Sequence, residues 1–123
     1  MPAGPELNAF IRTYFRSVWT LELLLYLKGN RGAACRVEEL VKALRASDSI
    51  VNQGIASLSM AGLVISEDDG GIRYSPASRE LEQAIDKVQL LYAERPDAIR
   101  RLIVTSANLG LSAFADSFRL RRD

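Results

Sequence analysis

Two features of this chain have residue types capable of covalent or metal chemistry: a single cysteine, Cys35, and an acidic run, Glu67–Asp69. The chain has no histidine, so Cys35 lacks an imidazole base and also lacks the partners that a zinc site needs. Calcium loops space their ligands at alternate positions, whereas these three acids are adjacent, which favours a solvated turn. We therefore expect no enzyme, no metal site and no cofactor. Cys35 is expected to be a buried or half-buried structural thiol, with an oxidant or metal sensor as the alternative.

Composition predicts one compact domain spanning residues 1–123. The chain is 48% hydrophobic and 25% charged, as is usual for a globular protein. The longest nearly apolar run, Leu21–Leu27, contains Glu22 and is far too short to cross a bilayer. No basic stretch leads into a long apolar segment at the N-terminus, so no secretory signal is expected. With one cysteine and no signal, we expect a cytoplasmic protein without a membrane partner.

The N-terminal part of the chain has the periodicity of two helices. Apolar residues at helical spacing predict a first helix over residues 5–15. Ser17 is placed to cap a second helix over Val18–Lys28, which is apolar nearly all round and is therefore expected to be central. Trp19 on this helix is expected to pack against neighbouring helices. A ligand pocket beside Trp19 is the alternative.

A helix, a turn and a second helix follow. Residues 34–36 are consistent with a brief strand, and residues 37–46 predict a third helix with two glutamates favouring its N-terminal end. Ser47 is placed to cap a fourth helix that runs to about Ala61. Gly62 is expected to end that helix, because glycine readily adopts the left-handed conformation found there.

A hairpin is predicted immediately afterwards. Two short apolar segments, residues 63–66 and 72–75, flank the turn residues 67–71, whose two glycines accept positive φ angles. The expected fold class is therefore mainly α with a small β-hairpin.

The last third of the chain is again helical. Ser78 is placed to cap a fifth helix through about Tyr92, and Pro96 predicts a break. A short helix over residues 98–103 and a last one over residues 106–120 are expected from their apolar spacing.

Charge is unevenly distributed along the chain. Residues 1–36 have five basic and two acidic groups, giving +3. Residues 37–75 have three basic and six acidic groups, giving −3, and residues 76–123 have eight basic and seven acidic groups, giving +1. The central helices and hairpin are thus the acidic part of the chain.

The order of helix, helix, turn, helix and hairpin resembles a winged helix-turn-helix, with a core over about residues 17–76 and extra N- and C-terminal helices. Residues 37–64, VEELVKALRASDSIVNQGIASLSMAGLV, are similar to the MarR-, ArsR- and PadR-like transcriptional regulators of bacteria. The apolar, small and glycine positions of that pattern are met by Leu44, Ala46, Ser47, Val51, Ile55, Leu58, Gly62, Leu63 and Val64.

This resemblance implies that the helix Asp48–Ala61 enters the major groove of double-stranded DNA. The DNA-binding residues that it implies are Lys42, Arg45, Ser47, Asp48, Ser49, Asn52, Gln53, Ser57 and Arg73. Asn and Gln amides can pair with adenine through two hydrogen bonds, and Ser hydroxyls bind bases or phosphates. For Asn52 and Gln53 the alternative is a solvated polar face, and for Arg73 it is compensation of the acidic turn. Further cations would be brought by a dimer through Arg12, Arg16, Arg31 or Arg36.

Three functional hypotheses follow. The resemblance implies a homodimeric regulator whose flanking helices, residues 5–15 and 78–120, form the interface or dock on their own domain. The −3 charge of residues 37–75 favours a winged-helix protein-interaction module without DNA binding. A ligand-responsive repressor with an effector near Trp19 is the third hypothesis.

Overall fold

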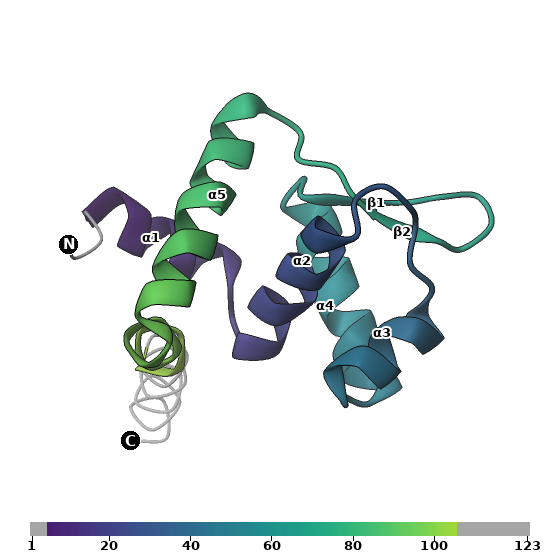
Figure 1. Cartoon of the computed structure of the whole chain (residues 1–123), viewed down its shortest axis with the longest axis horizontal. Coiled ribbons are helices and arrows are strands. Elements are labelled where there is room, and N and C mark those ends of the chain that lie inside the picture. Colours follow the sequence, from purple (N-terminus) through teal and green to yellow (C-terminus); the bar gives the residue numbers. More distant parts are fainter. Residues whose placement is uncertain (1–4, 106–123) are drawn as a thin grey trace, which may run out of the picture.

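The computed structural model of the chain describes residues 5–105, and the predicted helix 106–120 lies outside this range (Figure 1). The described part is mainly helical with one two-stranded antiparallel sheet, as predicted. Its elements are α1 (Pro5–Tyr14), α2 (Val18–Gly29), α3 (Val37–Leu44), α4 (Asp48–Met60), β1 (Val64–Ser66), β2 (Ile72–Tyr74) and α5 (Arg79–Glu94). Residues 96–105 are also helical. None of the described helices is long and apolar enough to pass through a lipid bilayer.

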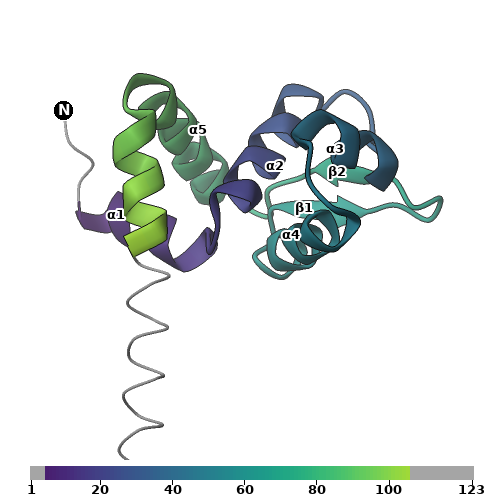
Figure 2. The ribbon, with the colours of Figure 1, turned by 90° about the horizontal axis from the view of Figure 1, so that it is seen from below.

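The molecule has two groups of elements joined through α2. In Figure 2, α3, α4 and the hairpin lie on one side of α2, and α1, α5 and the helix 96–105 lie on the other. Helix α2 contacts α3, α4 and β2, while α1 contacts α5. The predicted central position of α2 is thereby confirmed. Four of its leucines are fully buried: Leu21, Leu23, Leu24 and Leu27.

The ends of the helices follow local chemistry. Ser17, Ser47 and Ser78 each accept a hydrogen bond from a backbone N–H three residues later, which confirms all three predicted caps. Gly62 has a φ of +78° and follows the C-cap of α4, as predicted for a helix stop. Helix α5 ends at Glu94, and the helical conformation resumes at Pro96, where the missing N–H is tolerated in a first turn.

The two strands of the hairpin are shorter than predicted, with three residues in each strand. Ile65 pairs with Arg73 in the ladder. Gly70 has a φ of +87° in the turn, where its N–H donates to the Glu67 carbonyl oxygen at 2.9 Å. The brief strand expected at residues 34–36 is present as a single bridge between Cys35 and Ile72, closed by N–H···O bonds of 2.8 and 2.7 Å.

Several predicted helix boundaries differ from the structure: α5 continues past Tyr92 to Glu94, and residues 96–105 are helical where residues 98–103 were predicted. Two further differences lie at the ends of the first and third helices. The third helix ends at Leu44 rather than at residue 46, because Arg45 adopts the left-handed conformation with a φ of 54°. The first helix ends at Tyr14, one residue before the predicted end, and Phe15 is buried beyond it. Both differences arise where the chain turns to bring apolar side chains into the core.

The buried hydroxyl of Tyr74 supports a prediction about stability. Among the residues that the structure describes, Tyr74 Oη has no hydrogen-bond partner. A buried polar group without a partner costs about 1–3 kcal/mol. Replacing Tyr74 with phenylalanine should therefore leave the free energy of unfolding at neutral pH unchanged or raise it by about 1 kcal/mol, as measured by urea titration.

The same substitution should also change the response to alkali. Burial, followed by the charges of Asp86 and Glu82, raises the pKa of Tyr74 to about 12 from its ordinary value of 10.0. The folded state thus holds this proton more tightly than the unfolded state, so the associated stability is present below pH 10.0 and is lost as the pH rises towards 12. Between about pH 9 and about pH 11 the wild type should lose about 1 kcal/mol more than Tyr74→Phe. Parallel pH curves for the two proteins would contradict this.

Candidate nucleic-acid interface

Helix α4 divides into a buried face and a polar face. Val51, Gly54, Ile55 and Leu58 are buried, whereas Ile50, next to Val51, is 37% exposed. Ser49, Asn52 and Gln53 are exposed on the other side. Gln53 Nε2 lies 3.4 Å from Ser49 Oγ, one helical turn earlier, and donates to it. The exposed face therefore offers uncharged amide and hydroxyl groups, and its one charged side chain is the exposed Asp48 in the first turn.

Gly54 brings α4 close to α2. A Cβ atom at this position would lie 2.8 Å from Leu23 Cδ2, which is nearer than real Cβ contacts allow. Leu23 is 1% exposed and cannot move into solvent. The absence of a side chain at Gly54 thus sets the close crossing of the two helices, and this crossing fixes which side of α4 faces outward.

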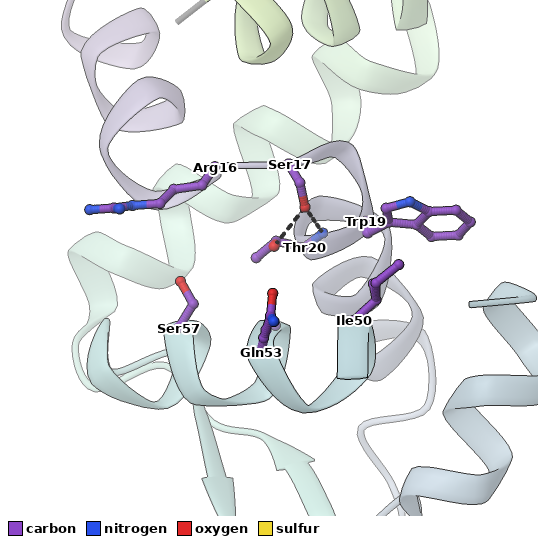
Figure 3. Close-up of a pocket in the computed structure, with 8 residues that line it drawn as sticks. Arg16, Ser17, Trp19, Thr20, Ile50, Gln53 and Ser57 are labelled. Atoms are coloured by element: carbon purple, nitrogen blue, oxygen red, sulfur yellow. Dashed lines mark hydrogen bonds between the residues drawn. The ribbon is translucent and has the colours of Figure 1, made fainter. Parts of the chain in front are cut away.

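A groove separates the start of α2 from the side of α4. Figure 3 shows Arg16 and Trp19 at its two ends, with Ser57, Gln53 and Ile50 of α4 lining the space between them. Arg16 immediately precedes the Ser17 cap, whose Oγ lies 3.1 Å from Thr20 Oγ1. The groove therefore places a cation beside two of the polar side chains predicted on α4.

Trp19 is not in the core. Its side chain is 39% exposed and lines the groove, so the expectation that it packs among helices was wrong. The buried side of α2 is filled by leucines, which leaves Trp19 on the outward side at the first turn. Phe15, by contrast, is 1% exposed and belongs to the core.

Further cations lie at the N-terminal end of α4. Lys42, in the last turn of α3, and Arg45, at its C-cap, are both exposed. Neither forms an ion pair with another residue in the range 5–105. Only Ala46 and the Ser47 cap separate Arg45 from α4, so two exposed cations stand just before the start of that helix.

Two arginines, one from the hairpin and one from the segment before α3, pair with acids of the hairpin turn. Arg73 Nε donates to Glu67 Oε2 at 2.9 Å, and both side chains are about one-third exposed. Arg36 Nη1 donates to the carbonyl oxygen of Asp69 at 2.8 Å, and Arg36 Nη2 lies 3.6 Å from the carboxylate of the same residue. The structure thus places Arg73 against the acidic turn, and contact with DNA would require it to leave Glu67.

Cys35 is a buried thiol, as predicted. It is 2% exposed and lies at the bridge to β2. Burial, and then the nearby Glu39 carboxylate, raises the pKa of Cys35 above its usual value, which keeps the thiol protonated at neutral pH. A thiol in this state is a poor nucleophile. In the described range no three cysteine or acidic side chains are grouped as metal ligands.

The structure brings together most of the residues predicted from sequence. Helices α3 and α4 contact each other, so the residues predicted on α4, at its cap and at the end of α3 lie on adjoining elements, while Arg73 is paired with Glu67 in the hairpin. Arg16 was considered only as a cation delivered by a dimer, yet it lines the groove beside Gln53 and Ser57 of its own chain. Its position directly before a serine cap is the sequence signal that could have placed it at the start of α2.

Neither a scan against protein-family models nor a search of curated proteins found a match for the chain.

Proposed function

We propose that this chain is a winged helix-turn-helix protein that binds double-stranded DNA and regulates transcription in the cytoplasm. Helices α2, α3 and α4 would form the helix-turn-helix unit, and the β1–β2 hairpin would be its wing. The observation that supports this best is the hydrogen-bonding face of α4, which carries only the charge of Asp48 and has cations beside it and at its N-terminal end. Helix α4 would enter the major groove through Ser49, Asn52 and Gln53.

Phosphate contacts would come from residues outside α4. The helix itself contributes only the charge of Asp48, and in the hairpin Glu67 is paired with Arg73 and Asp69 with Arg36 from the segment before α3. Arg16 along one side of α4, and Lys42 and Arg45 at its start, would supply the positive charge that holds the DNA backbone.

A homodimer would extend this surface. Leu90 on α5 is 63% exposed and Val104 on the helix 96–105 is 50% exposed, so both flanking helices present large apolar side chains to solvent. A symmetric interface through these helices would cover them and set two α4 helices side by side for a two-fold DNA site.

The role of Arg16 can be tested by titrating the protein with a duplex from its own upstream region at several salt concentrations. Binding should be saturable and should weaken as salt rises. Replacing Arg16 with glutamine should lower the affinity about fivefold and reduce the slope of log affinity against log salt by about 1. Arg101→Gln is the matched control, since Arg101 is exposed on the helix 96–105, away from the groove. Equal slopes of log affinity against log salt for the two variants would show that Arg16 makes no phosphate contact.

The second candidate is a winged-helix module that binds a protein and no DNA. It is favoured by the pairing of Arg73 with Glu67 and of Arg36 with Asp69, and by Met60, which is 90% exposed at the end of α4. The same titration distinguishes the candidates, because this module would show no salt-sensitive DNA affinity even at low salt and no retention on heparin.

A further inference from the structure

The groove between α2 and α4 is suited to a small ligand. Its volume is about 340 Å³, which lies at the lower end of the range of about 300–1,000 Å³ typical of ligand pockets. Most of its surface is apolar, with polar atoms contributed by side chains of α4 and by the start of α2. A pocket of this size holds one compact molecule rather than an extended cofactor.

Trp19 forms one end of the groove as an aromatic wall. Its indole is 39% exposed and lies above Ile50 of α4 (Figure 3). Aromatic side chains left accessible in this way are platforms on which planar rings stack, worth about 1–3 kcal/mol for a nucleic-acid base. The ligand is therefore expected to carry a flat ring at this end.

Arg16 forms the other end as an anion site. Its side chain is exposed and has no carboxylate within 4.0 Å among residues 5–105. The N-terminal end of α2 lies next to it and adds a partial positive charge. An arginine in this position favours a phosphate or carboxylate.

The middle of the groove presents Gln53 and Ser57. An amide offers a donor and an acceptor side by side, which is the arrangement that pairs with the N6 and N7 edge of adenine. Figure 3 places Gln53 between the tryptophan end and the arginine end, with Ser57 towards Arg16. The order along the groove is thus ring platform, ring edge, hydroxyl and cation.

We propose that this groove binds a single adenine nucleotide, with the base stacked on Trp19, its edge on Gln53 and its phosphate at Arg16. The nucleotide is either free or an unpaired residue of a nucleic-acid strand, because both present the same ring and phosphate. Gln53 and Ser57 also belong to the DNA-binding face described above. If that proposed function holds, a bound nucleotide and duplex DNA exclude one another.

Binding is tested without DNA, by calorimetric titration of the full chain with AMP and by the fluorescence of Trp19, the only tryptophan. AMP should bind saturably and quench the fluorescence. Adenosine and ribose 5-phosphate, each lacking one half of the ligand, should each bind about tenfold more weakly or worse. Arg16→Gln should weaken AMP about tenfold and leave adenosine unchanged, whereas Trp19→Leu should weaken both when measured by calorimetry.

Arg101→Gln is again the control, and it should bind AMP as the wild type does. If ribose 5-phosphate binds as tightly as AMP, the stacking on Trp19 is contradicted. If neither AMP nor a short oligo(dA) binds, the whole proposal is contradicted. Binding of oligo(dA) but not AMP would assign the site to a strand. Binding of AMP without binding of duplex DNA would support this site and contradict the proposed function. Binding of duplex DNA without binding of AMP or oligo(dA) would support the proposed function and contradict this site.

Discussion

Replacing Gly54 with valine should lower the free energy of unfolding by about 3 kcal/mol. The first carbon of the new side chain would lie 2.8 Å from Leu23 Cδ2 and 4.0 Å from Thr20 Oγ1, both on α2. Leu23 and Thr20 are buried, so α4 has to move away from α2 or Leu23 has to leave its rotamer. Urea unfolding followed by far-ultraviolet circular dichroism measures the loss.

Gly29 provides the matched control for this substitution. It is the last residue of α2, and a Cβ atom there would meet nothing within 4 Å. Gly29→Ala should therefore raise stability by about 0.5–1 kcal/mol, since alanine loses less conformational freedom than glycine in a helix. Gly54→Ala should fall between the two, because the same gain is offset by the clash. A Gly54→Val protein as stable as the wild type would show that α2 and α4 do not cross so closely.

The helices and their ends were predictable because their causes are local. The serines at positions 17, 47 and 78 each precede an apolar periodic segment, and each caps a helix. Gly62 ends α4 by adopting a positive φ that glycine accepts without strain. Local sequence patterns therefore predicted the order of the elements and most of the helix boundaries.

The surroundings of Trp19 were not predictable in the same way. An apolar helix such as α2 gives little indication of which of its large side chains will face outward, because the choice depends on which partners occupy each side. Three sides of α2 are covered, by α4 at Gly54, by α3 and by β2. Trp19, in the first turn, is left at the edge of this packing and becomes the wall of a groove.

The sequence left two roles open for Arg73, DNA contact and compensation of the acidic turn, and the structure shows Arg73 paired with Glu67 of that turn. The acids and Arg73 are evident as residues, but their contacts depend on the register that sets Ile65 opposite Arg73. That register brings Arg73 within 2.9 Å of Glu67. Arg73 is already counted in the net charge of −3 over residues 37–75, so the excess acidity of that segment is reduced only by Arg36, which comes from outside it and pairs with Asp69.

Replacing Asn52 and Gln53 together with alanine should weaken specific binding to duplex DNA about 100-fold. Both amides are exposed near the start of α4, and each is suited to two hydrogen bonds with one base, worth about 1–3 kcal/mol of discrimination. Fluorescence anisotropy with a labelled specific duplex and a scrambled duplex measures the loss. Folding should be unaffected, because neither side chain is buried and alanine favours a helix.

The salt dependence distinguishes this loss from that of a phosphate contact. Asn52 and Gln53 are uncharged, so the double variant should keep the wild-type slope of log affinity against log salt, whereas Arg16→Gln should lower it by about 1. Ser59→Ala, on the same helix two turns further along, is the control and should bind as the wild type does. Asn52→Ala alone should weaken duplex binding and leave AMP binding intact, because Gln53 but not Asn52 lines the groove. Unchanged discrimination between the two duplexes in the double variant would mean that this face of α4 does not read bases, and the protein-binding module would then be the better interpretation.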